Sequence, residues 1–200
     1  MFWWRTNGKK IGSLVLSLII GLGIFKYCQH HRYVEDQMVA GDYQTMSTAM
    51  FTNDLITVKT QGAKLIKYSN RTPYPRLAAL FLAKAAFVDN DLDQAVEHLR
   101  WVINNGKQDQ LWHIANLRLI KLLLLQNKLT EVETIKNNIE HKLPKGFTGR
   151  YQELFGDFLL AKNQKQEANM LYREAIQNLP QQISTVLLDL KVTETDTESN

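Results

Sequence analysis

The chain has 200 residues, of which 44% are hydrophobic and 22% charged, and its formal net charge is +4. Residues 1–32 carry five basic and no acidic side chains, whereas the other 168 residues carry 19 basic and 20 acidic side chains. A nucleic-acid-binding domain needs a basic face on the domain itself, so this distribution argues against nucleic acid as a partner. The single cysteine, Cys28, excludes an intramolecular disulfide.

An apolar segment follows a short basic segment at residues 1–10. Residues 11–25 carry no charge and are rich in Leu and Ile, and the apolar stretch continues to Cys28 with Lys26 as its one charge. A helix needs about 17–25 residues to cross a membrane. We therefore predict a transmembrane helix at residues 11–28.

Two other interpretations of this segment are weaker. A cleaved signal peptide would end in small residues, and the exit "FKYCQHHRY" has none. A buried core helix would normally carry a polar stripe, which this segment lacks. Basic residues are slightly more frequent on its N-terminal side, which favours a cytoplasmic N-terminus and, in a bacterial cell, a periplasmic domain.

The body of the chain is an internal repeat of helix pairs. Three segments each show an apolar helix, a break with an asparagine and a second, amphipathic helix. Asn90, Asn127 and Asn163 mark the breaks, 37 and 36 residues apart, and Pro144 and Pro180 close the last two units. The tetratricopeptide period is about 34 residues. We predict an all-α fold, in which the N-terminal transmembrane helix is followed by a tetratricopeptide-like α-solenoid of helix pairs.

Small residues distinguish the repeats. The third unit has Gly156 and Ala168 where its two helices should cross, so one helix can approach the other closely. The second unit has Ile120 and Val132 at these places. We expect the two helices of the middle pair to pack less closely than the others.

The remaining boundaries follow from the repeat phase. We expect an exit helix and a degenerate first helix pair at residues 29–72, and repeats with a C-terminal capping helix at 73–190. The tail at residues 191–200 is polar and acidic, with nothing to bury, so we expect it to be disordered.

The stretch "FVDNDLDQAVEHL" places three aspartates, Asp89, Asp91 and Asp93, at alternate positions, as a calcium loop does. Such a loop also needs Gly at its sixth position and Glu at its twelfth, where this chain has Gln94 and Arg100. The stretch fits a corner between two helices better, with Asp91 or Asp93 capping the second one.

Recognised motifs of catalysis are missing from the sequence. It has no nucleophile elbow, phosphate loop or dinucleotide fingerprint, and no metal-ligand spacing. We therefore expect a protein that is not an enzyme, with no catalytic, cofactor-binding or metal-binding residue and no small-molecule substrate.

A tetratricopeptide array presents a concave face, and its first helices line it. When the chain is aligned with the tetratricopeptide repeat, the positions that face the concave side carry both apolar and charged side chains, so we expect a protein-binding surface there. The expected residues are Leu80, Lys84, Phe87, Leu117, Lys121, Leu124, Glu153, Asp157 and Leu160.

Over nearly its whole length the chain resembles the family of ancillary subunits of the bacterial SecYEG translocon. The stretches "YPRLAALFLAKAAFVDNDLDQAVEHLRWVI" and "FGDFLLAKNQKQEANMLYREAI" carry the resemblance. It implies a non-catalytic, single-pass protein of the bacterial inner membrane with a periplasmic domain. The expected partners are the SecYEG translocon, secretory chains and periplasmic chaperones. The mechanism would be tethering, in which the anchor keeps the domain near its partners.

Two other functions stay open on the sequence. One is a tetratricopeptide scaffold that coordinates envelope assembly or cell division. The other is an envelope enzyme whose site is assembled from scattered residues. Partners found by co-purification separate the first from a translocon subunit, and a pocket of converging titratable groups would favour the second.

Overall fold

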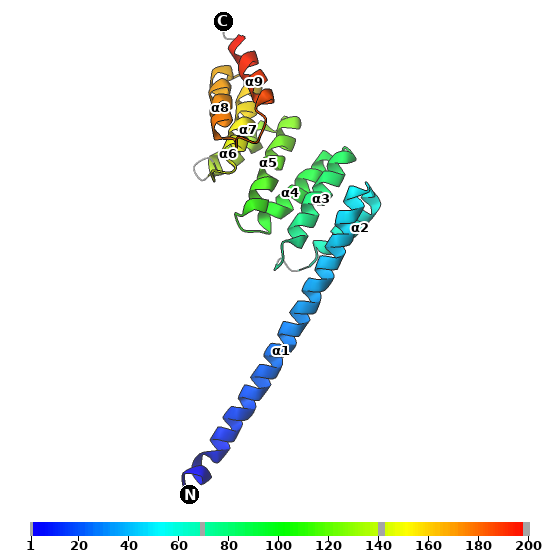
Figure 1. Ribbon diagram of the computed structural model, residues 1–200, viewed down its shortest axis with the longest axis vertical. Helices are drawn as coiled ribbons and strands as arrows, with labels where there is room; N and C mark the ends of the chain where they lie inside the picture. Colours follow the sequence, from blue (N-terminus) through cyan, green and yellow to red (C-terminus); the bar gives the residue numbers. More distant parts are fainter. Residues whose placement is uncertain (1, 69–70, 140–142, 198–200) are drawn as a thin grey trace.

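The computed structural model describes residues 2–68, 71–139 and 143–197, and the side chains of these residues except for 2–15 and 197. The described residues form helices only (Figure 1). The helices are α1 (Phe2–Phe51), α2 (Leu55–Leu65), α3 (Tyr74–Val88), α4 (Leu92–Asn104), α5 (Gln110–Leu125), α6 (Leu129–Ile139), α7 (Thr148–Ala161), α8 (Lys165–Asn178) and α9 (Val186–Thr197).

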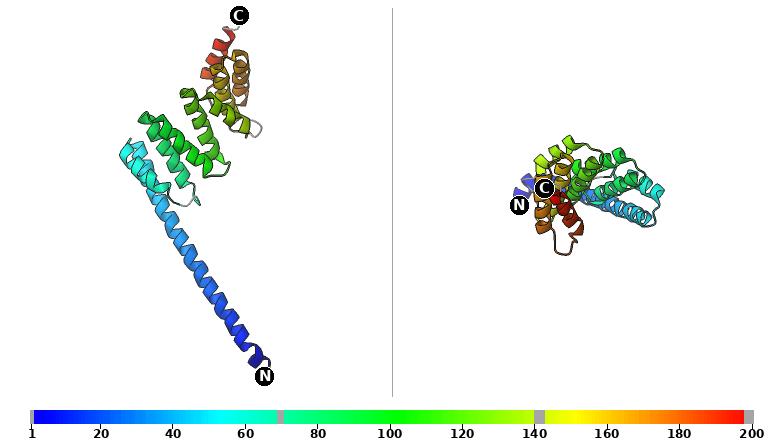
Figure 2. Two further views of the ribbon diagram at one scale, coloured as in Figure 1. Left: turned by 180° about the vertical axis from the view of Figure 1, so that it is seen from behind. Right: turned by 90° about the horizontal axis from the view of Figure 1, so that it is seen from above.

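The helices pair in chain order, and the pairs stack on one another. The C-terminal part of α1 packs against α2, α3 against α4, α5 against α6 and α7 against α8, while α9 packs on α8. The N-terminal part of α1 projects away from the stack, so the two termini lie at opposite ends (Figure 1). Seen from above, the pairs follow a curved path (Figure 2). The prediction of an all-α array of helix pairs is confirmed.

Asparagines in the left-handed backbone region form the corners of the pairs. Non-glycine residues avoid positive φ, but asparagine tolerates it because its short polar side chain can hydrogen-bond locally. The three predicted breaks have this geometry, and so does the corner of the expected first helix pair, at Asn53. The positive-φ residues are Asn53 (58°), Asn90 (60°), Asn127 (54°) and Asn163 (61°). The first helix pair therefore turns in the same way as the others.

Aspartates after two of these asparagines begin the next helix. Asp54 accepts a hydrogen bond from the Thr57 amide, and Asp91 accepts one from the Gln94 amide, each at 3.0 Å. These bonds satisfy amide groups that a helix N-terminus leaves without a partner. The corner interpretation of residues 87–99 is confirmed, with Asp91 as the cap.

Close approach of α7 and α8 depends on Gly156. A Cβ atom on this residue would lie 2.7 Å from Cδ1 of the buried Tyr172 ring. Ala168 lies fully buried at the same crossing. The helices of the middle pair, α5 and α6, contact each other much less closely than α7 and α8 do, as the bulkier Ile120 and Val132 predict.

One helix, α3, joins the two larger apolar clusters. Ala78 faces a cluster made with α1 and α2, and the next residue, Ala79, faces a cluster that extends through α4, α5, α6 and α7. A third cluster holds α8 and α9 together. Because neighbouring pairs share their buried faces, the described helices form one continuous stack, as repeat arrays do.

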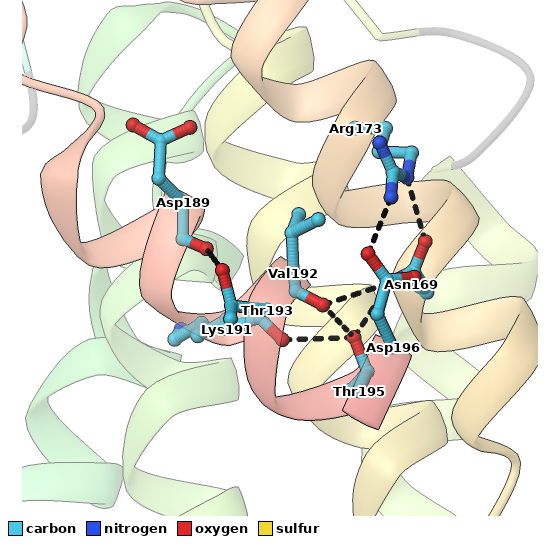
Figure 3. Close-up of polar contacts among 8 residues, drawn as sticks. All are labelled: Asn169, Arg173, Asp189, Lys191, Val192, Thr193, Thr195 and Asp196. Carbon is cyan, nitrogen blue, oxygen red and sulfur yellow. Dashed lines mark hydrogen bonds and ion pairs between the residues drawn. The ribbon is translucent and has the colours of Figure 1, made fainter. Parts of the chain in front are cut away.

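The structure differs from the expected disordered tail at residues 191–200. Helix α9 continues to Thr197, and Leu188, Val192 and Thr195 form a buried stripe at helical spacing. Asn169 of α8 donates hydrogen bonds to the Val192 carbonyl (3.0 Å) and to Thr195 Oγ1 (2.7 Å), and Arg173 pairs with Asp196 at 2.6 Å (Figure 3). The buried stripe was not predicted because the expectation of disorder rested on the polar, acidic composition of the tail. Residues 198–200 of the expected tail lie outside the described residues.

The predicted membrane segment lies on the projecting part of α1. Within the part of the chain that the structure describes, no helix combines the length and hydrophobicity needed to cross a membrane. The predicted transmembrane helix at residues 11–28 is therefore not supported by this finding. Its residues 11–15 lie among those whose side chains are not described.

Candidate protein-binding groove

Two adjoining hollows lie along the first helices of the pairs. The α3–α5 hollow has a volume of about 290 Å³ and is lined by Ala83, Lys84, Phe87, Leu99, Arg118, Lys121, Leu122 and Leu125. The α5–α9 hollow has a volume of about 820 Å³, and α5, α7 and α9 contribute most of its lining. Arg118 and Lys121 line both hollows, so together they form one surface, which we call the groove.

Six of the nine predicted residues line the groove. They are Lys84, Phe87, Leu117, Lys121, Glu153 and Asp157. The other three line neither hollow and pack against neighbouring helices. Leu80 is buried in the core around α3 to α7, Leu124 packs against that core, and Leu160 packs against the α8–α9 cluster. These leucines bury apolar area between helices, which stabilises the stack more than exposure in the groove would.

The sequence analysis missed several residues that line the groove. Arg118 and Leu125 lie three residues before and four residues after Lys121, so helical spacing could have placed them on the same face. Leu187, Leu190 and Lys191 come from α9, far away in the sequence, and only the packing of α9 brings them to the groove.

Four cations of the groove have no carboxylate partner among the described residues. They are Lys84, Arg118, Lys121 and Arg150, which line one or both hollows. The other described arginines of the helix pairs do have such partners: Arg71 pairs with Glu35, Arg76 with Asp109, Arg100 with Glu131 and Arg173 with Asp196.

Arg118 is exposed at the surface of the groove, but neighbouring side chains partly desolvate its guanidinium group and lower its pKa. An anion bound in the groove would face a guanidinium group that has no carboxylate partner among the described residues.

On the α9 side of the groove, Lys191 pairs with two carboxylates of α7. Lys191 of α9 contacts Glu153 Oε1 at 3.2 Å and Asp157 Oδ1 at 2.7 Å, and Tyr172 donates a hydrogen bond to Asp157 at 2.9 Å. Burial opposes the charge of Lys191, but the bonds and charges of Asp157 and Glu153 raise its pKa overall. Burial and the nearby Asp157 charge raise the pKa of Tyr172. These groups hold one another in place and attach α9 to α7.

Exposed apolar side chains stand at both ends of the groove. Phe87 and Leu125 are 47% and 60% exposed in the α3–α5 hollow, and Leu187 and Leu190 are 72% and 61% exposed on α9. Rimmed by charged groups, such apolar surface is typical of a protein interaction site.

The three aspartates of the α3–α4 corner are each engaged within the chain. Asp89 pairs with Lys59, Asp91 caps α4, and Asp93 accepts a hydrogen bond from Gln126 at 2.9 Å. Over the described ranges, no group of three or more His, Cys, Asp or Glu side chains is arranged to hold a metal ion. The arrangement can bind charged and apolar groups, and the described groove side chains present no nucleophile with a neighbouring base.

Comparison with known proteins gives a match over almost the full chain. A family model described as tetratricopeptide repeat-like domain matches residues 2–196. The chain is 25% identical over 193 residues to a Haemophilus influenzae protein called ancillary SecYEG translocon subunit, covering 94% of this chain and 91% of that protein. Proteins of the same name from Aggregatibacter actinomycetemcomitans and Neisseria gonorrhoeae are 27% and 26% identical, with 94% and 96% of this chain and 91% of each relative covered. These matches confirm the resemblance noted in the sequence. No solved structure matches the chain.

Proposed function

Since the chain belongs to the tetratricopeptide repeat-like domain family, we propose that it is a non-catalytic, membrane-anchored interaction module, an ancillary subunit of the Sec translocon. The observation that carries this proposal is the similarity over 94% of the chain to proteins called ancillary SecYEG translocon subunit. The match covers α1 as well as the helix pairs, so it concerns the whole arrangement and not the repeat alone.

The anchor of this module is the apolar part of α1, residues 11–28. The described part of this segment carries apolar side chains that are more than half exposed on a helix projecting from the stack (Figure 1). They are Leu16, Leu18, Ile19, Ile20, Leu22, Ile24 and Phe25. Exposure of apolar surface to water costs about 25 cal/mol per Å². Insertion into the bacterial inner membrane removes this cost, with residues 1–10 in the cytoplasm and the helix pairs in the periplasm.

Tethering is the mechanism of this module. The anchor holds the groove near the translocon, where linked binding partners meet at an effective concentration that reaches millimolar values for short linkers. Weak contacts between the groove and an emerging secretory chain then suffice to capture it. The module passes such chains on to periplasmic chaperones.

Alkaline carbonate extraction of membranes tests the anchor. The full chain should stay in the membrane pellet, and the double variant Ile19→Asp, Leu22→Asp should move to the supernatant, because charged groups are costly in the bilayer. The control Val34→Asp, Met38→Asp changes two exposed apolar residues of α1 beyond the predicted span and should stay in the pellet. Extraction of the unmodified chain would contradict the anchor.

Purification from membranes tests the partner. The tagged full chain, solubilised in a mild detergent, should carry SecY, SecE and SecG with it, as quantified by mass spectrometry against an untagged strain. Recovery of cell-division or cell-wall proteins without translocon subunits would contradict the proposal and support the rival scaffold function.

A further inference from the structure

We infer that the groove selects protein segments in which acidic side chains lie between two apolar ones. This inference rests on the proposed function, since it specifies which segments the interaction module would capture. It follows from the charge of the centre of the groove, the apolar character of its two ends and the excess of cations over carboxylates in its lining.

Unpaired cations occupy the centre of the groove. Arg118 and Lys121 line both hollows, with Lys84 on the α3 side and Arg150 on the α7 side. Several cations elsewhere on the stack pair with carboxylates of the adjacent pair, as in Lys59 with Asp89 and Lys162 with Glu133. The central cations therefore remain available for an anionic group from outside, and carboxylates bind arginine in a strong, often bidentate geometry.

The two ends of the groove are apolar, so the bound segment should carry apolar side chains on either side of its anionic group. Phe87 and Leu125 form one end, and Leu187 and Leu190 form the other. A segment that spans both hollows meets apolar surface, then positive charge, then apolar surface again. Burial of one apolar side chain of the segment at each end removes it from water and strengthens binding.

Carboxylates also line the groove, but cations outnumber them. Glu153 and Asp157 are both engaged by Lys191, and Glu194 also lines the α5–α9 hollow. A lysine-rich segment would therefore meet five cations and three carboxylates in the lining of the groove. Electrostatic complementarity therefore discriminates between acidic and basic segments, since like charges brought together at an interface are costly.

A protein segment fits this chemistry better than nucleic acid does. Nucleic acid requires an extended basic surface, and residues 33–200 carry 19 basic against 20 acidic side chains. Only a polypeptide supplies aliphatic side chains and carboxylates in alternation. The proposed occupant is an acidic, leucine-containing segment of a partner protein.

Fluorescence anisotropy with three labelled peptides tests the inference, with the full chain in nanodiscs of zwitterionic lipid. The first peptide has three Glu between two Leu, the second replaces Glu by Lys, and the third replaces Leu by Ser. We expect the first to bind about tenfold or more tightly than either of the others, and to weaken as salt is added. Equal affinity for the Glu and Lys peptides would overturn the inference.

Matched variants separate the groove from general charge effects. The double variant Arg118→Gln, Lys121→Gln should weaken binding of the Glu peptide about tenfold. The control Lys67→Gln, Lys107→Gln removes two exposed cations outside the groove and should leave affinity unchanged. Equal losses in both variants would overturn the inference. If the Glu peptide fails to bind while SecY, SecE and SecG still co-purify with the chain, the selectivity is wrong and the proposed function stands.

Discussion

Gly156 sets the distance between α7 and α8. A Cβ atom there would lie 2.7 Å from Cδ1 of Tyr172, whose ring is fully buried and whose hydroxyl is bonded to Asp157. The ring is held at its far end and has no room to move. We predict that Gly156→Ala lowers the free energy of unfolding by about 1–3 kcal/mol, although alanine is the better helix former. Thermal unfolding of the full chain in detergent, followed by circular dichroism, measures the effect.

Gly41→Ala is the matched control. Gly41 also lies within a helix, α1, and nothing stands within 4 Å of where its Cβ would be. Without a clash, the higher helix propensity of alanine should stabilise the chain by up to about 1 kcal/mol. If both variants shift the unfolding temperature alike, Gly156 does not set the helix distance.

His113 makes the stability of the helix stack depend on pH. Its Nδ1 atom lies 3.2 Å from the Tyr151 hydroxyl and its ring stacks on Phe147. Burial lowers the pKa of His113, against the opposing charge of Asp109, and burial likewise lowers the pKa of His98. The unfolded chain, with a histidine pKa of about 6.5, then binds more protons than the folded chain just below that pH. The contribution of the two neutral histidines to the free energy of unfolding is therefore fully present above about pH 6.5. It is lost as the pH falls toward their folded-state pKa values.

Unfolding temperatures measured between pH 7.5 and pH 5.5 test this dependence. The parent chain should lose stability over this interval, and His113→Gln should show a smaller loss because one of the two groups no longer titrates. An identical decline in parent and variant would show that His113 does not contribute.

At the scale of single helices, α9 depends on Asn169. Its amide nitrogen donates to the Val192 carbonyl, to Thr195 Oγ1 and to Asp196 Oδ1 (Figure 3). We predict that Asn169→Ala raises amide hydrogen exchange in residues 186–197 while α3 to α6 keep the exchange rates of the parent. The expected cost is about 1–3 kcal/mol, since Thr195 is buried and its neighbouring groups would lose partners.

Asn178→Ala controls for loss of an asparagine on α8. The amide nitrogen of Asn178 donates to Gln152 Oε1 and to the Glu174 carbonyl, each at 3.0 Å. Exchange in α9 should match that of the parent. Faster exchange in α9 for this variant alone would contradict the role of Asn169.

Elements with a local signal were predictable from the sequence. Asparagine at a corner, aspartate at a helix start and the period of apolar residues gave the helix pairs, because each feature depends on a few adjacent residues. The fourth corner at Asn53 has the same signal, since Asp54 follows it as Asp91 follows Asn90. A helix pair was expected here, but Asn53 was not singled out as its corner, because the apolar pattern of the first pair is weaker.

Features that depend on packing were not predictable in this way. Composition alone suggested a disordered tail, yet Leu188, Val192 and Thr195 lie at helical spacing and are buried against α8. Six residues of the predicted register line the groove, but Leu80, Leu124 and Leu160 pack against neighbours whose positions only the folded stack determines. That Arg118 has no carboxylate partner among the described residues is likewise a property of the assembled pairs.

At the scale of the whole molecule, the proposed function requires that one end of α1 anchors the protein in the membrane and that the groove binds the partner proteins. Photo-crosslinking in membranes tests this claim most directly, with probes in place of Lys84 and Lys121 in the groove and Tyr33 on α1. Probes in place of Glu97 and Asn137, exposed on the second helices α4 and α6, are the controls.

We expect crosslinks from Lys84 and Lys121 to secretory chains in transit, from Tyr33 to translocon subunits, and few from the control positions. Crosslinks from the groove only to cell-division or cell-wall proteins, or crosslinks of equal strength from Glu97 and Asn137, would contradict the proposed function.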